Sequence, residues 1–283
     1  MISLPLLGGF LRYSLVALFL ICSCSAFGDL LYGLSSSIPG TVYTINTATG
    51  AATPFVNLTN DILTQVVDLT ILNGTLYASD VVAGAGSFSN FGTIDPVTGA
   101  FTILSQQGGS TNWQGLAANP ALGIIYAVDE TGFPVPLISV TPSGAFTTIG
   151  NTDIQINDLA YDSVHGILYA VDESANLYTI NVTTAAATLI GSTGLGNLIK
   201  IGLGYDSNNN VLYANFVGNH SLYTLNTTTG AATLVGPNGT TADIDGLADF
   251  GVVSIAPEPA TTALIGLGLA ALVCNRRRFK HHP

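Results

Sequence analysis

Carboxylate side chains recur at matching places along this 283-residue chain, and they are the residues best suited to chemistry. The tripeptide Val-Asp-Glu occurs at 128–130 and again at 171–173. Carboxylate oxygens suit Ca²⁺, which takes about six to eight oxygen ligands. We therefore predict a Ca²⁺ site, and no other cofactor, drawn from acidic residues that share one rim of the fold: Asp68, Asp80, Asp129, Glu130, Asp158, Asp172, Glu173 and Asp245.

These carboxylates also have a simpler interpretation, as turn residues that recur because the chain itself repeats. Asp and Asn side chains favour turns because they hydrogen-bond to the backbone two residues on. The sequence has no Asp-x-Asp-x-Asp-Gly loop of the kind that binds Ca²⁺. Both interpretations stay open at the level of the sequence.

Trp113, the only tryptophan, forms a second candidate site with its neighbour Gln114. An exposed Trp on one face of the protein would offer a flat ring on which a sugar can stack. We predict a sugar-binding role for this pair on that condition. The alternative is that Trp113 fills the packing between structural units.

Few residues are candidates for catalysis. Between residues 27 and 255 the only histidines are His165 and His220, both in turn-like contexts. There is no His-x-x-x-His pair for zinc and no Gly-rich phosphate loop. We predict no catalytic residue and no enzymatic activity; the alternative is a metal-dependent hydrolase or lactonase that uses the rim carboxylates.

The elements that position these residues follow from an internal repeat. An aliphatic-Tyr-small step recurs at intervals of 45, 49, 43 and 44 residues, at Tyr32, Tyr77, Tyr126, Tyr169 and Tyr213. Each step is followed by a β-branched or aromatic run, at 42–46, 91–95, 137–141, 177–181 and 222–226. A Thr-rich run such as 229–236 comes next, and a leading run such as 158–162 or 202–206 precedes the Tyr step. These are strand and turn signals.

Four strands in each repeat of this length are typical of propeller blades. The first copy lacks its leading strand, whereas the segment from Asp245 to Phe250 is a leading strand with no blade after it. We predict an all-β fold, a β-propeller of five four-stranded blades that the C-terminal strand closes. An open stack of the same units is the alternative. In the ring, the ends of second strands and the starts of leading strands share one face, which gathers the carboxylates there.

The charge of the region from Phe27 to Ile255 limits its partners. It holds sixteen acidic residues and one basic residue, Lys200, so its net charge is −15. Such a surface repels nucleic acid, which needs Lys and Arg to displace counterions. Cations and neutral polymers such as polysaccharides are compatible partners, although solubility alone also explains the charge. All three cysteines lie outside this region, at Cys22, Cys24 and Cys274, so it has no disulfide.

Both ends of the chain carry targeting signals. Residues 1–26 contain Arg12, an apolar run and small residues, the pattern of a secretory signal peptide. We predict cleavage after Ala26, with lipoprotein processing at Cys24 as the alternative. At residues 256–283, Pro257, Glu258 and Pro259 precede a 14-residue apolar run and the basic residues Arg276, Arg277 and Arg278. That run is short for a span of about 20 residues, and the basic residues favour the cytoplasmic side.

This tail resembles the PEP-CTERM sorting tail of exported bacterial proteins, and the repeats resemble those of secreted bacterial β-propellers. The resemblance implies recognition by an exosortase-type protease, with a C-terminal transmembrane helix that holds the protein in the inner membrane until cleavage. An ordinary membrane anchor is the alternative. The resemblance further implies a location in the cell envelope or extracellular matrix. It implies as well a non-enzymatic interaction platform, associated with exopolysaccharide or biofilm.

Overall fold

The computed structural model describes residues 30–59, 65–82, 88–108, 111–196 and 200–248. The predicted signal peptide and the sorting tail, with Pro257, Glu258, Pro259 and Arg276–Arg278, lie outside these residues. In the described part of the chain no helix has the length and apolar character needed to cross a membrane.

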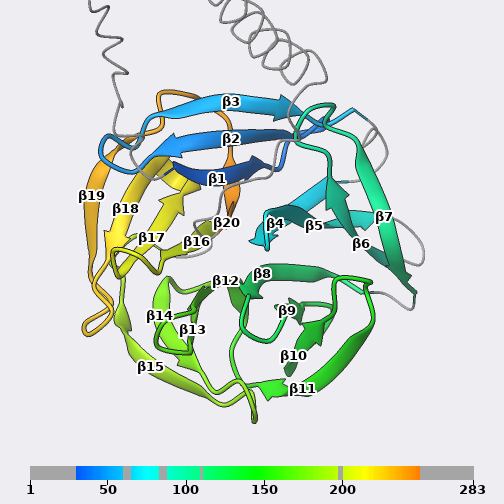
Figure 1. Cartoon of the computed structure of the whole chain (residues 1–283). Coiled ribbons are helices and arrows are strands. Elements are labelled where there is room, and N and C mark those ends of the chain that lie inside the picture. The colour runs from blue at the N-terminus through cyan, green and yellow to red at the C-terminus, as the bar shows by residue number, and fades with distance from the viewer. Residues whose placement is uncertain (1–29, 60–64, 83–87, 109–110, 197–199, 249–283) are drawn as a thin grey trace, which may run out of the picture.

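Five four-stranded antiparallel sheets stand around a central axis as the blades of a propeller (Figure 1). The innermost strands are β20 (Ile244–Ala248), β4 (Gln65–Leu72), β8 (Trp113–Asn119), β12 (Ile156–Asp162) and β16 (Ile201–Asp206). The second strands are β1 (Leu30–Ser35), β5 (Thr75–Val82), β9 (Ile124–Asp129), β13 (Ile167–Asp172) and β17 (Val211–Phe216). A short 3-10 helix, η1 (Val217–Asn219), follows β17.

The two outer positions of each blade complete the sheets. The third strands are β2 (Thr41–Asn46), β6 (Phe88–Ile94), β10 (Val135–Val140), β14 (Asn176–Ile180) and β18 (Ser221–Leu225). The outermost strands are β3 (Ala52–Asn57), β7 (Phe101–Gln107), β11 (Phe146–Thr152), β15 (Ala187–Ser192) and β19 (Ala232–Pro237). We call the face where innermost strands begin the entry face, and the face that holds the turns after them the turn face.

The ring closes as the sequence predicts. Strand β20 pairs with β1 in antiparallel register, with Tyr32 opposite Ala248 and Gly33 opposite Leu247. The last strand of the ring therefore becomes the innermost strand of the first blade, and the prediction of five closed blades is confirmed. Every strand of the described residues lies within 30–248, so a segment spanning 27–255 keeps all the contacts of the described fold.

The hydrophobic core is divided among the five interfaces between blades. Strand residues alternate between the two faces of a sheet, and here both faces are apolar because each blade packs against two neighbours. Leu34 of the first blade packs with Leu69 and Leu76 of the second, and Leu31 packs with Leu222 of the fifth. Three further buried clusters fill the remaining interfaces.

Turns between third and outermost strands are built by a repeated local device. The side-chain oxygen of Asn46, Asp95, Asn181 or Asn226 accepts hydrogen bonds from the backbone N–H groups two and three residues on. This is the Asx-type turn expected of Asn and Asp. It explains why the second sequence marker ends in these residues.

Each of these turns also packs against the backbone of the preceding blade. A Cβ atom added to Gly191 on β15 would overlap the carbonyl oxygen of Thr229, in the turn of the next blade, and one added to Gly236 on β19 would overlap that of Thr49. At Gly150 on β11 an added Cβ would lie 2.7 Å from the Thr184 oxygen. Glycine on the outermost strand therefore allows neighbouring blades to approach closely.

The blade contact at Gly191 predicts a stability effect. We expect Gly191→Ala to lower the free energy of unfolding of segment 27–255 by about 1–3 kcal/mol, since overpacking against backbone cannot be relieved by a rotamer change. Thermal unfolding followed by circular dichroism measures this as a melting point roughly 2–10 °C lower. Gly132→Ala is the matched control, because nothing lies within 4 Å of an added Cβ there. Equal melting points for the two variants would contradict the close contact between blades.

Candidate functional site

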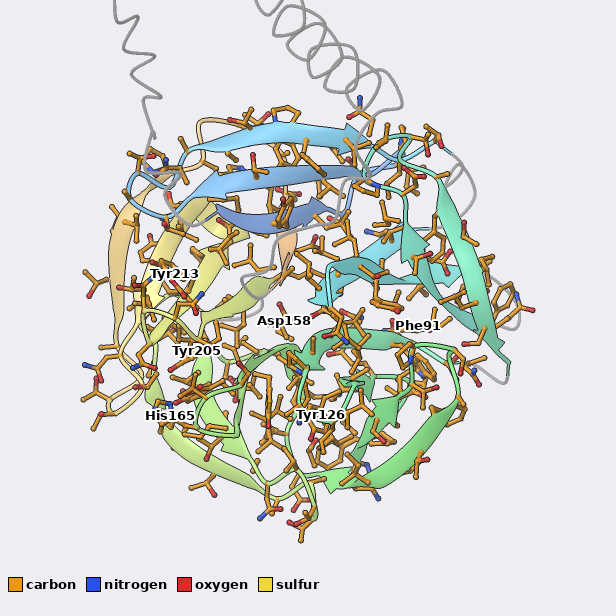
Figure 2. All side chains as sticks on the ribbon, viewed as in Figure 1. Phe91, Tyr126, Asp158, His165, Tyr205 and Tyr213 are labelled. Carbon is orange, nitrogen blue, oxygen red and sulfur yellow. The ribbon has the colours of Figure 1, made fainter. Side chains whose placement is uncertain are left out.

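The candidate site lies where the five innermost strands start, near the axis on the entry face. Each innermost strand contains a buried leucine, namely Leu69, Leu116, Leu159, Leu203 and Leu247. The residues directly before these leucines are Asp68, Gly115, Asp158, Gly202 and Gly246. Two aspartates and three glycines therefore occupy equivalent positions around the axis, and Figure 2 shows Asp158 near the centre of the ring.

Each of the two aspartates joins its own blade to the next one. Asp158 accepts a hydrogen bond from the N–H of Leu159 at 2.7 Å through Oδ1 and from that of Leu203, in the following blade, at 2.6 Å through Oδ2. Asp68 makes the same pair of bonds to the N–H groups of Leu69 and Leu116. Since the following blade, which donates the N–H group, has glycine at the equivalent position in both cases, no side chain blocks the approach.

Asp68 and Asp158 also hydrogen-bond to each other, across the position of Gly115 in the intervening blade. Asp68 is only 2% exposed and Asp158 only 1% exposed. Burial raises the pKa of Asp68 to about 7, and burial together with the charge of Asp68 raises the pKa of Asp158 well above its ordinary value. Two carboxyl groups this close do not both ionise readily, so the pair holds a shared proton at neutral pH.

A second acidic group on this face includes the only basic residue of the propeller. The Lys200 ammonium lies 3.1 Å from Oδ2 of Asp245, whose side chain is 1% exposed. Burial raises the pKa of Asp245, and Lys200 opposes that rise. Burial also raises the pKa of Glu130 to about 7, with Lys200 lowering it and Glu173 and Asp129 raising it further. Lys200 therefore compensates charge for several carboxylates at once.

The carboxylates at the ends of second strands serve as turn caps. Oδ1 of Asp129 accepts bonds from the N–H groups of Asn112 and Thr131 at 3.0 and 3.2 Å. Asp172 accepts from the N–H groups of Ser174 and Asn176 and from the Tyr178 hydroxyl. Asp80 instead bonds across its sheet, where it accepts from the N–H of Asn90, the residue opposite it on β6. The bonds of Asp129 and Asp172 are those of the turn interpretation of the sequence.

The structure thus brings together part of the predicted rim set. Asp68 with Asp158, and Asp245 with Lys200, lie near the axis. Asp129 and Asp172 each cap a turn of their own blade, and Asp80 bonds across its sheet to β6. Within the described ranges no three His, Cys, Asp or Glu side chains are arranged to hold a metal ion. The Ca²⁺ site stays a prediction, and binding would have to displace protein donors from these oxygens.

Trp113 requires a correction. Its side chain is buried, with the residue 1% exposed, so the expectation of an exposed ring available to a sugar is wrong. The ring packs edge-on against Phe146 at a centroid distance of 5.2 Å and near Phe91, between the second and third blades. Gln114 is half-buried, and its amide donates to Asn112 at 3.0 Å. The residues beside Trp113 are polar, with Thr111 and Asn112 before it and Gln114 after it, so the local sequence does not signal its burial.

Sequence reasoning identified Lys200 but assigned it no role. Its importance comes from its position directly before β16, where it reaches the start of the neighbouring innermost strand β20. A lone cation in a strongly acidic region is the signal that would have marked it. The carboxyl pair could not be found from spacing, because its members lie in blades 2 and 4, 90 residues apart.

Solved structures with the same architecture support the fold. A chain of the nidogen/laminin complex matches with 13% identity and a TM-score of 0.53, over 77% of this chain and 97% of that chain. A structural genomics protein of unknown function from Bacteroides thetaiotaomicron matches with 13% identity and a TM-score of 0.50, over 77% of this chain and 56% of that one. A luciferin-regenerating enzyme also matches with 13% identity, over 82% of this chain and 87% of that chain, but its TM-score of 0.48 is too low to support a shared fold. Likeness at this identity shows the fold alone, and no curated protein matches in sequence.

Fold and topology place the described domain among the five-bladed β-propellers. The C-terminal segment is the more specific finding, because residues 256–278 match the PEP-CTERM protein-sorting motif. The chain therefore combines a PEP-CTERM sorting motif with a β-propeller domain. The motif implies processing by an exosortase-type enzyme and export to the bacterial cell envelope or beyond.

The buried carboxyl pair predicts an unusual dependence of stability on pH. A raised pKa in the folded state means that the folded protein binds the proton more tightly than the unfolded chain. The resulting stabilisation is complete below the ordinary pKa of 3.8 and is lost as the pH rises through about 7. We therefore expect the free energy of unfolding to fall between pH 4 and pH 7, measured by urea denaturation of segment 27–255.

The variant Asp158→Asn tests the origin of this slope. Its carboxamide can donate to Asp68 without a titrating proton, so the decrease between pH 4 and pH 7 should become smaller. Asp68, still buried in this variant, and Glu130 and Asp245, whose pKa values are also raised, leave a residual slope. The control is Asp95→Asn, in an exposed turn far from the axis. A slope unchanged in Asp158→Asn would refute the shared proton.

Proposed function

We propose that the exported propeller is a non-enzymatic interaction platform that associates with neutral extracellular polysaccharide. The observation that carries this proposal is the distribution of charge across the blades. The charged residues of the strands, all aspartates, lie in the inner two strands of a blade: Asp68, Asp80, Asp129, Asp158, Asp162, Asp172, Asp206 and Asp245. The ten third and outermost strands contain no Asp, Glu, Lys, Arg or His.

This uncharged outer wall is rich in hydroxyl groups. Exposed threonines occur at the same place on four of the five outermost strands, at Thr53, Thr102, Thr188 and Thr233, and the remaining strand has Thr147 and Thr148. Hydroxyl groups donate and accept hydrogen bonds without an ionic partner, which suits a neutral polyhydroxylated polymer. Aliphatic side chains alternate with them, since Ile103, Leu189 and Leu234 are more than half exposed.

Additional support comes from the roles of the carboxylates. The oxygens of Asp129 and Asp172 are engaged by backbone and side-chain donors of their own turns, and those of Asp158 hold two blades together. Because their oxygens are already hydrogen-bonded, these carboxylates stabilise the ring, and the outer surface remains to bind a polymer. The metal-dependent hydrolase or lactonase stays an alternative prediction.

Co-sedimentation tests the proposal directly. We expect segment 27–255 to sediment with an insoluble neutral polysaccharide such as cellulose or curdlan, and to retain binding in 0.5 M NaCl, because ionic contacts contribute little. No reducing ends should be released over hours. A parallel series with Ca²⁺, on wild type and on Asp129→Ala with Asp172→Ala, measures any metal requirement. Absence of sedimentation with every neutral polymer would refute the platform, and progressive release of reducing ends would favour the enzyme.

A further inference from the structure

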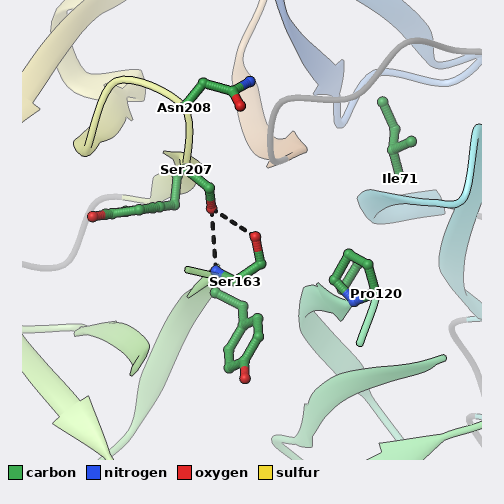
Figure 3. A pocket seen from close by; sticks show the side chains of 8 residues that line it. Ile71, Pro120, Ser163, Ser207 and Asn208 are labelled. Atoms are coloured by element: carbon green, nitrogen blue, oxygen red, sulfur yellow. Dashed lines mark hydrogen bonds between the residues drawn. The ribbon is translucent and has the colours of Figure 1, made fainter. Parts of the chain in front are cut away.

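A second feature of interest lies near the axis of the propeller on the turn face, away from the carboxyl cluster. A pocket of about 130 Å³ lies there, lined by residues of four blades at the ends of β4, β8, β12 and β16. Figure 3 shows Ile71 and Pro120 on one side of it and Ser163, Ser207 and Asn208 on the other. The pocket is therefore a product of the closed ring.

The lining of this pocket carries no charged side chain. Ile71 and Ala118 are buried, 6% and 2% exposed, and supply apolar surface, while Pro120, Ser163 and Asn208 are exposed around the opening. This combination of apolar surface and uncharged polar groups contrasts with the entry face, where Asp245, Glu130 and the Asp68–Asp158 pair gather.

Two aspartates beside the pocket accept hydrogen bonds from the backbone of their own turns. Asp206, 1% exposed, accepts bonds from the N–H groups of Asn208 and Asn209 at 2.9 and 3.1 Å. Asp162, also 1% exposed, accepts from the N–H groups of Val164 and His165 and lies 2.6 Å from the His165 ring. These bonds fix the turns, and with them the positions of Ser163, Ser207 and Asn208.

A hydrogen-bonded pair of serines leaves one hydroxyl donor available at the opening of the pocket. The N–H and the hydroxyl of Ser163 both donate to Oγ of Ser207, at 3.1 and 3.0 Å (Figure 3). Because two donors occupy the lone pairs of Ser207 Oγ, its own O–H is left to donate. In the described part of the chain neither this O–H nor the Asn208 side-chain amide has a hydrogen-bond partner. Together they offer donors and one acceptor to a neutral hydroxylated ligand.

We propose that this axial pocket binds the terminal sugar unit of a neutral polysaccharide. The inference rests on the proposed function and names the place where one unit of the polymer is recognised. Its volume equals that of about four waters at ~30 Å³ each and is below the ~300 Å³ of pockets that enclose larger ligands. That volume is smaller than a whole hexose unit, so the pocket would hold one edge of a terminal sugar ring, and the rest of the ring would lie outside the opening. Ile71 and Pro120 contact the C–H face of the ring, and Ser207 and Asn208 bind its hydroxyls.

The charge of the domain and the uncharged lining of the pocket argue against anionic and cationic ligands. An anion would meet a domain of net charge −15 with no basic side chain in the lining. A cation would find no carboxylate in it, because Asp162 and Asp206 are occupied within their turns. Uncharged hydroxyl-bearing ligands remain as the class that the pocket suits.

Isothermal titration of segment 27–255 with cellohexaose, maltohexaose and mannohexaose tests the site. We expect at least one to bind, its monosaccharide to compete for the same site, and oligogalacturonate not to bind. The double variant Ser207→Ala with Asn208→Ala removes two hydrogen bonds to the ligand and should weaken binding about ten- to thirty-fold. The single variant Asn208→Ala changes one exposed side chain that makes no bond in the fold, and should weaken binding by a smaller factor.

The matched control is Ser174→Ala, which truncates an exposed serine that lies outside both the pocket and the outer wall. This control should bind like the wild type. Equal affinity of the wild type and both pocket variants would overturn the inference, as would tighter binding of oligogalacturonate. Polymer sedimentation without oligosaccharide binding would overturn the pocket alone, whereas loss of polymer sedimentation in the wild type refutes the proposed function itself.

Discussion

Closure of the ring by β20 and β1 is the interaction on which the rest of the structure depends. The pairing joins residues 32–35 to 244–248, more than 200 positions apart. It completes the first blade and closes the five blades into a cycle in which each packs between two neighbours, and it protects the inner edge of the first blade. The fifth interface, with Leu31, Leu222 and Leu247, exists only because this strand returns.

A closed ring brings five strand starts to one axis, and this crowding explains where glycine and aspartate occur. Three glycines make room, while Asp68 and Asp158 use the space to bind the N–H groups of the following blades. Their enforced proximity requires them to share a proton at neutral pH. The same arrangement keeps the charged residues of the strands near the axis and leaves the outer wall neutral. Electrostatics and packing therefore both favour acidic inner strands and uncharged outer strands.

The two faces of the propeller differ in chemistry for a related reason. On the entry face, acidic residues cap strand starts and second-strand ends, and Lys200 offsets part of their charge. On the turn face, Asp162 and Asp206 are enclosed by the turns they cap, so the axial pocket presents hydroxyl, amide and apolar groups. An exported protein with this division can repel other anions while it offers neutral surfaces to a polymer.

The blade count, the strand order and the closure could be predicted from the amino-acid sequence, because each blade repeats strand and turn signals that act over a few residues. The sorting tail could be predicted as well, since its motif is local. The meeting of particular carboxylates became visible in the folded ring, where Asp68 and Asp158 are neighbours although their spacing does not reveal it. Burial of Trp113 and the neutral pocket were decided there as well, because exposure and enclosure depend on how whole blades pack against each other.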